Sequence, residues 1–313
     1  MRHKPRVPKP FTTDIDATTR YCAVYGHPIK HSASPAMQNA GIAALGLNWR
    51  YLAFEVHPHD LASAIAGAKA MKFIGLNLTV PHKLLALEMV DVLDVSAKLW
   101  GAVNTIRFET KNTNGEWVPL AQLPGDEIKE IRSHGFNTDA DAITRSLHED
   151  LGIKLNGASV LLSGAGGAGR VAAFKVAAEG VKNLFLVNRT QEKAEEIATQ
   201  IQQLHPRVNI TVGYPKIAVD LLLNATSLGL KESDTLPLDL SRFSLKNALA
   251  VYDMIYRPAE TPLLIAAKKA GCRTANGIGM LLYQGAKALE LWSEKTAPIE
   301  TMRQALEQNV YQK

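Results

Sequence analysis

Short apolar runs alternate with runs of helical spacing along the first part of the chain. The strand-like runs are short and rich in aromatic or β-branched residues, whereas the helical runs repeat apolar residues at the helical period. In chain order the two kinds of run are 21–26, 34–46, 49–56, 59–71, 73–80 and 82–90. This alternation predicts an α/β fold class, with a mostly parallel sheet covered by helices in a first domain over residues 20–138.

The region that follows departs from this alternation. VNTIRF at Val103–Phe108 predicts another strand, and the polar segment TKNTNGEW after it contains an Asn-Gly turn signal. Residues 109–132 are therefore expected to form a loop or a hairpin, whose function the sequence does not indicate.

A second series of strands and helices begins at Asp139. Asp139–Leu151 has a helical pattern, and strand-like runs that alternate with helices follow from Ser159. This order predicts a Rossmann domain over residues 139–277. A last segment, 278–313, contains two helical runs, the second starting near Pro298, and is expected to fold back onto the first domain.

Composition and charge narrow the classes of function. The chain has 313 residues, of which 46% are hydrophobic and 21% are charged, as in globular proteins long enough for two domains. Its net charge of +5 favours anionic partners. No run of Lys and Arg with interleaved aromatic residues indicates a nucleic-acid groove, so a small anionic ligand is the simpler expectation.

The cysteines and the N-terminal segment bear on location. Only Cys22 and Cys272 are present, which supports neither a disulfide framework nor a thiolate zinc site and favours a reducing cytoplasm. Residues 1–19 are basic and rich in proline, so they are expected to form a flexible arm. They lack the apolar core of a secretory signal, and no run of about 18 apolar residues predicts a membrane span.

The run LLSGAGGAGR has the glycine spacing of a dinucleotide-binding turn, directly after an apolar strand and at the start of a helix. Gly164 permits the tight turn, Gly166 lets the backbone approach a pyrophosphate, and Gly169 allows the helix to pack closely on the strand. The start of the helix offers unpaired N–H groups to the anion. Strand, turn and helix together predict a dinucleotide site.

The next strand ends in Asn188, Arg189 and Thr190, where an enzyme that uses NAD usually carries an acidic residue. The guanidinium of Arg189 can pair with a 2'-phosphate and stack on the adenine, and Thr190 and Lys193 can add donors. This pattern favours NADP over NAD. The alternative is that Thr190 caps a helix and Arg189 is an ordinary surface residue.

Polar motifs at strand ends and helix starts predict a second ligand site. GHPIKHSASPAM places Ser32 and Ser34 two residues apart before Pro35, although serine before proline is also a common helix cap. GLNLTVPHK, GAVNT, GFNTD, LNATSLG, DMIYRPAETPLL and NGIGMLLYQGA have the same kind of placement. Open α/β sheets bind their ligands at such positions.

With these motifs in this order, the chain closely resembles the shikimate dehydrogenase family, whose members reduce 3-dehydroshikimate to shikimate with NADPH. The resemblance covers nearly everything from Tyr21 to about Leu291. It implies NADP as the cofactor, a small-molecule substrate, and a place in the biosynthesis of chorismate and the aromatic amino acids. A cytoplasmic monomer or homodimer, with no nucleic-acid or membrane partner, is the matching expectation.

The resemblance also assigns residues to the two ligands. The substrate residues would be Ser32, Ser34, Asn77, Thr79, Lys83, Asn104, Asp139, Tyr256 and Gln284. The cofactor residues would be Gly164, Ala165, Gly166, Gly167, Ala168, Gly169, Asn188, Arg189, Thr190, Lys193, Ala225, Thr226, Ser227, Ile255, Gly277 and Met280. No metal is expected, because His57, His59 and His82 are not accompanied by cysteines or carboxylates at ligand spacing.

Lys83 and Asp139 are the expected catalytic residues. Reduction of a carbonyl needs a proton for the developing alkoxide, and a lysine paired with an aspartate can donate it and stabilise the charge. The sequence does not decide which of the two moves the proton, and their titrations can be coupled. Both residues also have an ordinary interpretation, Lys83 as a solvated surface lysine and Asp139 as a helix cap. The other substrate residues could equally be turn, surface or packing residues.

Two features depart from the family pattern. The segment between GAVNT and GFNTD is longer than the usual hairpin, and Ala140 and Ala142 replace glycines that commonly follow NTD, which questions how closely that helix packs. Other functions also stay open: a quinate/shikimate or aminoshikimate dehydrogenase with a different cofactor preference, or a relative that binds ligands without catalysis. The presence of Lys83 and Asp139 argues against the last.

Overall fold

The structure is a computed structural model that describes residues 15–124, 127–128, 130–231 and 233–312. Most of the segment expected to be a flexible arm lies outside the described residues. Its last residue, Thr19, is buried, and its hydroxyl donates to Asn48 Oδ1 at 3.1 Å. The chain divides into two compact units, Met1–Asn137 with Gly285–Leu306 and Thr138–Gln284 with Glu307–Lys313.

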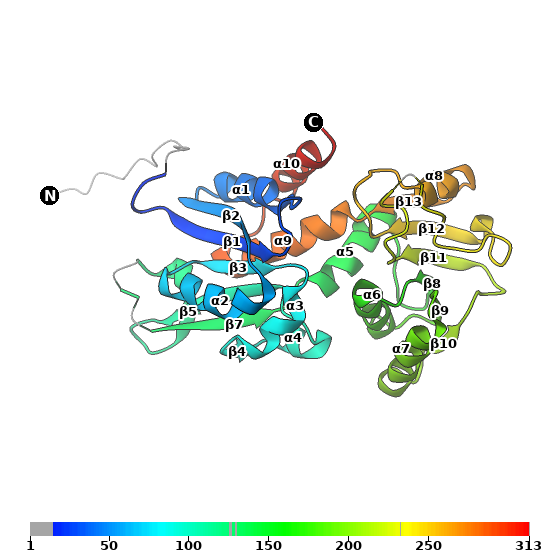
Figure 1. Cartoon of the computed structure of the whole chain (residues 1–313), viewed down its shortest axis with the longest axis horizontal. Coiled ribbons are helices and arrows are strands. Elements are labelled where there is room, and N and C mark those ends of the chain that lie inside the picture. The colour runs from blue at the N-terminus through cyan, green and yellow to red at the C-terminus, as the bar shows by residue number, and fades with distance from the viewer. Residues whose placement is uncertain (1–14, 125–126, 129, 232, 313) are drawn as a thin grey trace. The chain divides into compact units, whose positions relative to one another are not determined.

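The first unit contains a seven-stranded sheet (Figure 1). Its strands are β1 (Arg20–Gly26), β2 (Trp49–Glu55), β3 (Gly75–Leu78), β4 (Val92–Leu93), β5 (Thr105–Lys111), β6 (Trp117–Pro119) and β7 (Ile131–Phe136). They lie in the order β2-β1-β3-β5-β7-β4, with β6 paired to β5. The pairs of β1 with β2 and β3, and of β4 with β7, are parallel, whereas β5 is antiparallel to β3, β6 and β7. The sheet is therefore mixed, and β5 introduces every antiparallel pair.

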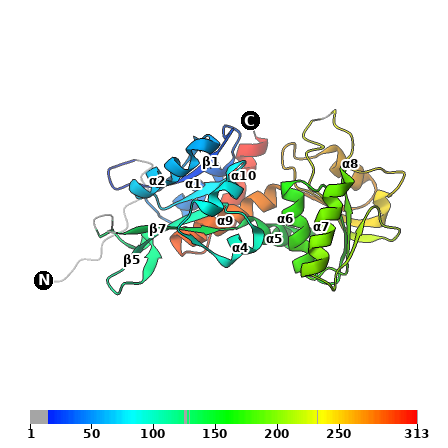
Figure 2. The same ribbon diagram turned by 60° about the horizontal axis from the view of Figure 1, so that its bottom comes forward.

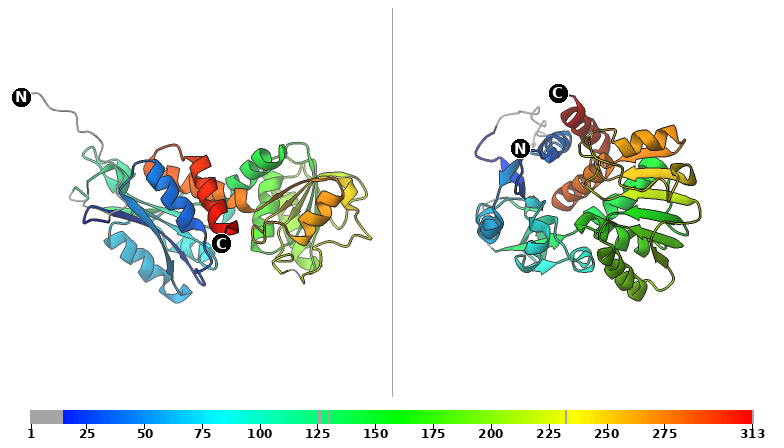
Figure 3. Two further views of the ribbon diagram at one scale, coloured as in Figure 1. Left: turned by 90° about the horizontal axis from the view of Figure 1, so that it is seen from above. Right: turned by 45° about the vertical axis from the view of Figure 1, so that its right-hand side comes forward.

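Helices cover both faces of this sheet. They are α1 (Ser34–Ala44), α2 (Leu61–Ala70), α3 (His82–Leu85), α4 (Val95–Trp100) and the parts of α9 (Ile278–Ser293) and α10 (Ile299–Tyr311) that belong to this unit. One face packs against α2 and α4 in an apolar core. On the other face α1 and α10 lie side by side (Figure 3), and a Cβ on Gly41 of α1 would lie 3.0 Å from the Met302 side chain of α10.

Trp292 of α9 fills the space over the middle of the first sheet. It has no exposed surface, and its indole Nε1 donates to the carbonyl oxygen of Ile106 at 3.0 Å. A Cβ on Gly75 would lie 2.1 Å from that nitrogen, so the strand carries glycine where the indole crosses it. The first unit is thus completed by residues from the end of the chain.

A buried carboxylate joins β5 to β7. The Glu109 side chain is 1% exposed; it forms ion pairs with Arg107, with Arg132 (Nε to Oε2, 2.7 Å) and with His134 (Nδ1 to Oε1, 3.0 Å). Burial alone would raise the pKa of Glu109, but the hydrogen bonds from His134, Arg107 and Arg132 outweigh it and lower the pKa to about 2.

Two local expectations have different outcomes. The Asn-Gly turn is confirmed: β5 and β6 form an antiparallel hairpin, and Gly115 has a φ of +81°. The helix expected over residues 82–90 is wrong in length, because α3 ends at Leu85 and a short 3-10 helix, Ala86–Glu88, follows. The carbonyl oxygen of Lys83, which a longer helix would use internally, accepts instead from Val103 N at 2.8 Å.

The second unit contains a six-stranded, wholly parallel sheet. Its strands are β8 (Ser159–Ser163), β9 (Asn183–Val187), β10 (Asn209–Val212), β11 (Val219–Asn224), β12 (Ala248–Asp253) and β13 (Arg273–Asn276). They lie in the order β10-β9-β8-β11-β12-β13. This order, in which the chain starts in the middle and winds outward in both directions, is that of a Rossmann fold, as predicted.

Helices again lie on both faces of the second sheet. The helices α5 (Asp139–Leu151), α6 (Gly167–Ala178) and α7 (Gln191–Leu204) pack together on one face (Figure 2). The other face is covered by α8 (Pro262–Lys269) and an apolar segment around Phe243. Ala140 and Ala142 of α5 are 1% and 3% exposed, so the helix packs with both extra methyl groups enclosed.

Candidate functional site

The strand order of the second sheet reverses between β8 and β11. In doubly wound sheets the ligand crevice opens at the carboxyl ends of the two strands on either side of that reversal. Gly164–Gly169 follow β8 there, and Ala225–Ser227 follow β11. The structure therefore brings two of the predicted cofactor-binding segments to the place where this fold binds nucleotides.

The glycines of the first segment have separate roles. Gly164 has a φ of +108° and its N–H donates to the Val187 carbonyl at 2.9 Å, so it makes the turn. A Cβ on Gly169 would lie 2.1 Å from the Gly164 carbonyl oxygen. At Gly166 and Gly167, by contrast, a Cβ would meet no atom within 4 Å beyond its own stretch of backbone. The protein itself thus needs the first and last glycines, while the middle two leave room beside the backbone.

The side chain of Asn188 links the glycine turn to the start of α7. Its Oδ1 accepts from Ala165 N at 3.0 Å, and its Nδ2 donates to the Thr190 carbonyl at 2.7 Å. Thr190 occupies the N-cap position of α7, but its hydroxyl makes no capping bond. Arg189 and Lys193 are exposed, and within the described part of the chain neither forms an ion pair. Two exposed cations therefore lie between the end of β9 and the first turn of α7.

The other predicted cofactor residues follow β11, β12 and β13. Ala225 N donates to the Ser163 carbonyl at 2.8 Å, which fixes the start of the second segment against the first. Ile255 is buried, and its carbonyl oxygen accepts from Gly277 N at 3.2 Å. A Cβ on Gly277 would lie 2.0 Å from a neighbouring backbone oxygen, and Met280 follows, half-buried, in the first turns of α9.

In the first unit, Asn77 is the centre of a buried hydrogen-bond network. The Tyr51 hydroxyl donates to Asn77 Oδ1 at 2.8 Å. Asn77 Nδ2 donates to the Asn104 carbonyl at 3.3 Å and to Thr105 Oγ1 at 3.0 Å. Tyr51 and Thr105 were not among the predicted residues, because strand periodicity shows that a residue faces inward and not which strand lies beside it.

The two serines at the start of α1 join this network. Burial raises the pKa of Tyr51 well above its usual value, and a hydrogen bond with Ser34 opposes that rise. Ser32 Oγ lies 3.4 Å from Ser34 N. The N-cap of α1 is Ala33, which makes no side-chain capping bond, but Ser32 Oγ accepts from Ser34 N, the first N–H of the helix. A capping role therefore accounts for Ser32 and not for Ser34.

Backbone bonds bring the remaining first-unit residues to the same edge of the sheet. Thr79 N donates to the Tyr25 carbonyl at 3.0 Å, and Leu78 N donates to the Asn104 carbonyl at 2.8 Å. Lys83 is half-buried one turn farther on, and its carbonyl is bonded to Val103. The structure thus groups six of the predicted substrate residues within one unit: Ser32, Ser34, Asn77, Thr79, Lys83 and Asn104.

The other three predicted substrate residues belong to the second unit. Asp139 is the first residue of α5 and is 8% exposed; the N-cap position is occupied by Thr138. Tyr256 is half-buried, burial raises the pKa of its hydroxyl, and its carbonyl accepts from Tyr311 Oη at 3.0 Å. Gln284 is half-buried in α9, and its Nε2 donates to the Leu281 carbonyl at 2.8 Å.

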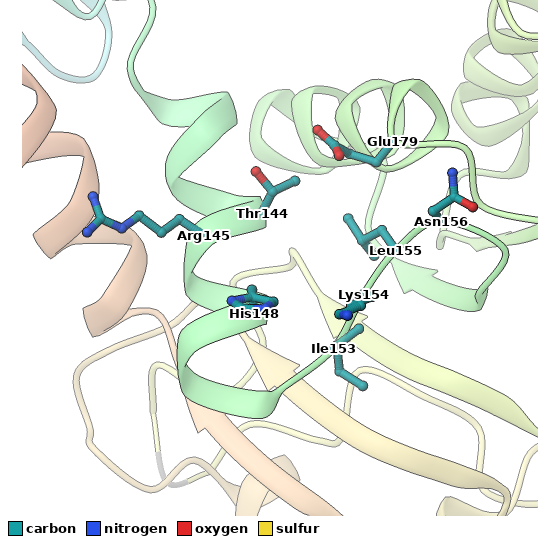
Figure 4. A pocket seen from close by; sticks show the side chains of 8 residues that line it. All are labelled: Thr144, Arg145, His148, Ile153, Lys154, Leu155, Asn156 and Glu179. Carbon is teal, nitrogen blue, oxygen red and sulfur yellow. The ribbon is translucent and has the colours of Figure 1, made fainter.

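Two open surface pockets, each of about 400 Å³, lie elsewhere on the second unit. One is lined by Thr144, Arg145, His148, Ile153, Lys154, Leu155, Asn156 and Glu179 (Figure 4). The side chain of Arg145 points away from it and stacks on the Tyr283 ring, 4.5 Å from the centroid. The other pocket borders the first residues of β11 and β12. Both lie at the amino ends of strands, opposite to the edge where such sheets bind ligands.

Two negative findings hold for the described residues only. No group of three or more His, Cys, Asp or Glu residues among them is arranged to hold a metal ion. No helix among them combines the length and the apolar character needed to cross a membrane. Cys22 and Cys272 are buried free thiols.

Comparison with known proteins identifies the family. Residues 24–106 match the model of the shikimate dehydrogenase substrate binding domain, 146–226 match that of shikimate / quinate 5-dehydrogenase, and 277–307 match that of the shikimate 5'-dehydrogenase C-terminal domain. A shikimate dehydrogenase (NADP(+)) of Methanopyrus kandleri is 37% identical over 302 residues, covering 94% of this chain and 97% of the relative. The chain belongs to the shikimate dehydrogenase family. The resemblance found in the motifs is confirmed.

Solved structures of similar proteins have the same fold as this shikimate dehydrogenase family member. A crystal structure of shikimate dehydrogenase in complex with NADP+ is 33% identical, with a TM-score of 0.80 over 97% of this chain and 100% of that one. A ligand-free 5-ketofructose reductase of Gluconobacter is 32% identical, with a TM-score of 0.77 over 93% and 99% of the two chains. The predicted two-domain α/β class is thus confirmed. The second likeness shows that proteins of this fold differ in their named substrates.

The geometry of this shikimate dehydrogenase family member fits a dinucleotide at the point between β8 and β11 where the strand order reverses. The open space at Gly166 and Gly167 lets a pyrophosphate approach the backbone at the start of α6. Arg189 and Lys193 add exposed positive charge at the end of β9, where an acidic residue would repel a 2'-phosphate.

Proposed function

We propose that the chain is an NADP-dependent shikimate dehydrogenase, which catalyses the reversible reduction of 3-dehydroshikimate to shikimate. The main support is the match over 94% of the chain to a relative that carries this name. The placement of the predicted residues at the ligand-binding edges of both sheets adds physical support. The proposed role is one step in the biosynthesis of chorismate and the aromatic amino acids.

The cofactor residues would act as follows. The backbone N–H groups at Gly166 and Gly167 bind the pyrophosphate, and Arg189 with Lys193 binds the 2'-phosphate. Thr226 contacts the middle of the dinucleotide. Ile255, Gly277 and Met280 line the nicotinamide end. Bound NADPH supplies the hydride.

The substrate residues would hold the ring by short polar side chains. Ser32 and Ser34 bind the carboxylate. Asn77, Thr79 and Asn104 bind ring hydroxyls, and Tyr256 and Gln284 are further proposed contacts. Several fixed hydrogen bonds are needed because hydride transfer tolerates little misorientation of the reacting carbon.

The proton for the developing alkoxide would come from Lys83 or Asp139. The ammonium of Lys83 can donate a proton and stabilise the negative charge as it forms. The proton that Lys83 gives up would be replaced from solvent, directly or through Asp139. In the reverse direction the free amine of Lys83 or the carboxylate of Asp139 would take the proton of the hydroxyl group.

The cellular location, the assembly and the partners of the protein are part of the same proposal. The protein would act in the cytoplasm as a monomer or homodimer, with a small-molecule substrate and no nucleic-acid or membrane partner. The net charge of +5 suits a substrate and a cofactor that are both anionic.

A cofactor and substrate matrix tests the proposal. The purified chain is incubated with shikimate or quinate and with NADP or NAD, and the near-ultraviolet absorbance of the reduced nicotinamide is followed. We expect the highest kcat/KM for shikimate with NADP. A preference for quinate, or for NAD, would identify one of the alternative dehydrogenases, and no turnover in any combination would indicate a non-catalytic relative.

A further inference from the structure

A row of polar residues crosses the carboxyl edge of the second sheet. In the strand register Asn224 of β11 is opposite Ser163 of β8 on one side and Asp253 of β12 on the other. All three side chains are buried, with at most 2% of their surface exposed. Polar groups buried so deeply need hydrogen-bond partners, so their partners show what the row holds in place.

Asn224 organises the segment that follows β11. Its Oδ1 accepts from the backbone N–H of Thr226 at 3.0 Å and from the Thr226 hydroxyl at 2.8 Å. Its Nδ2 donates to the Leu228 carbonyl at 3.4 Å and to Asp253 Oδ1 at 2.9 Å. One amide therefore folds the Thr226 turn and joins it to the neighbouring strand.

Asp253 does the same for the segment that follows β12. Its Oδ1 also accepts from Ile255 N at 3.1 Å, and its Oδ2 accepts from the Thr261 hydroxyl at 2.6 Å. Burial raises the pKa of Asp253, while the bonds from Thr261, Ile255 and Asn224 oppose that rise. Thr261 is itself fully buried and caps α8 by accepting from Leu264 N at 3.3 Å.

We infer that Asn224, Asp253 and Thr261 are positioning residues that hold the two loops of the cofactor edge in one fixed arrangement. The inference rests on the proposed function, which places Thr226 and Ile255 against the cofactor. The chain of bonds runs from the half-buried Thr226 turn through Asn224, Asp253 and Thr261, all fully buried, to the start of α8. A shift of either loop by a fraction of an ångström would therefore misplace the dinucleotide relative to the reacting carbon.

Ser163 supplies the matched control. It belongs to the same row and is equally buried, but its hydroxyl donates to the Pro237 carbonyl at 2.8 Å, in a segment with no predicted cofactor contact. If the row only stabilised the fold, Ser163→Ala would behave like the other variants. If Asn224 and Thr261 position the cofactor loops, their variants alone would change the kinetics with NADP.

The experiment compares full-length Asn224→Ala, Thr261→Val, Thr261→Ser and Ser163→Ala. Steady-state kinetics give kcat and the KM values for NADP and shikimate, and the fluorescence of NADPH measures its binding without substrate. We expect kcat/KM for NADP to fall about 10- to 100-fold in Asn224→Ala and Thr261→Val. The KM for shikimate should change little, because most residues proposed to bind it lie in the first unit. Thr261→Ser keeps the hydroxyl and should stay within about twofold of the original chain, as should Ser163→Ala.

Several outcomes would overturn the inference. One is that Asn224→Ala and Thr261→Val fold and keep the kcat/KM and the NADPH affinity of the original chain. Another is that Thr261→Ser is as impaired as Thr261→Val. If Asn224→Ala does not fold, as judged by circular dichroism, Thr261→Val decides. An unmodified chain that binds NADPH but never turns over shikimate would refute the proposed function, while the NADPH affinities of the variants would still test the positioning role.

Discussion

The Cβ position of Gly169 lies 2.1 Å from the carbonyl oxygen of Gly164, so the last glycine of the turn packs directly on the first. No side chain fits there unless the backbone moves. The glycine spacing alone does not show which glycines the turn needs in order to fold and which leave room for a ligand. This contact shows that Gly169 is needed for folding.

Alanine substitutions along this turn should therefore affect two different properties, stability at Gly169 and cofactor affinity at Gly166. Gly169→Ala forces the turn and α6 apart and should lower the melting temperature. Gly166→Ala meets no atom within 4 Å beyond its own stretch of backbone, so the protein should keep its stability while NADPH affinity falls at least tenfold, because the methyl group fills space proposed for the pyrophosphate. Calorimetry and NADPH fluorescence measure the two effects. Equal loss of affinity and stability in both variants would contradict this separation.

Arg189 should decide the choice of cofactor. Arg189→Ala removes the charge proposed to pair with the 2'-phosphate, so KM for NADP should rise about tenfold or more, while KM for NAD should hardly change. Arg207→Ala is the control, because Arg207 is also exposed in the second unit but precedes the amino end of β10. An unchanged ratio of kcat/KM for NADP and NAD in Arg189→Ala would assign the specificity to other residues.

Lys83 should be needed for turnover more than for binding. Lys83→Ala should lower kcat by about a hundredfold or more, since proton transfer to the alkoxide contributes at least that much, and should change shikimate affinity less. Lys98→Ala, an exposed lysine in α4, is the matched control and should behave like the original chain. Isothermal titration with shikimate separates binding from turnover. A large loss of affinity with unchanged kcat would make Lys83 a binding residue.

Glu109 should make stability depend on acid pH. Its pKa is lowered from 4.5 to about 2, so its contribution is complete above pH 4.5 and is lost as the pH falls toward 2. The shift corresponds to a contribution of Glu109 to the free energy of unfolding on the order of 3 kcal/mol. Urea unfolding should show Glu109→Gln to be less stable by roughly that amount at neutral pH, with the difference shrinking in acid.

Glu130→Gln is the control for Glu109→Gln. Glu130 pairs with Lys111 in the same region, but its side chain is 58% exposed, so the change should cost less than about 1 kcal/mol. A loss at Glu109→Gln that persists unchanged down to pH 2 would show that packing, and not the charge, is responsible.

His82 should act in the same direction at a higher pH. It has no exposed surface, and burial lowers its pKa below 6.5; the Val56 carbonyl opposes this, whereas His27 and His57 lower the pKa further. The unfolded chain thus takes up a proton more readily than the folded one, so stability is complete above pH 6.5 and decreases below it. His82→Gln should weaken this decrease in urea unfolding between about pH 7.5 and 5.5, whereas His148→Gln, an exposed histidine, should not.

The Rossmann half could be predicted from the sequence largely because its strands are short apolar runs and its helices have regular spacing. Asp139–Leu151 was predicted with the bounds that α5 has. Elements without a pattern were missed: β4 has only two residues, and β10 is an edge strand whose exposed and half-buried positions alternate weakly. The early end of α3 depends on Val103, a residue 20 positions from Lys83, and no local pattern reveals such a bond.

The candidate site shows the same limit. The predicted residues came from motifs at strand ends, which the chain order exposes. Tyr51 and Asp253 were not predicted, although they hold Asn77 and the Ile255 loop in place. Their roles depend on which strands become neighbours and in what register, and that is a property of the assembled sheet.

The distribution of the first unit over both ends of the chain has a consequence for its synthesis. Its sheet is complete once Phe136 has left the ribosome, yet the space over Gly75 stays unfilled until Trp292 has been made. More than 150 residues, including nearly all of the second unit, are translated in between. The N-terminal half must therefore wait, with one face of its sheet covered by α1 alone, for the last helices of its own chain, and a premature stop before Trp292 would leave that cover incomplete.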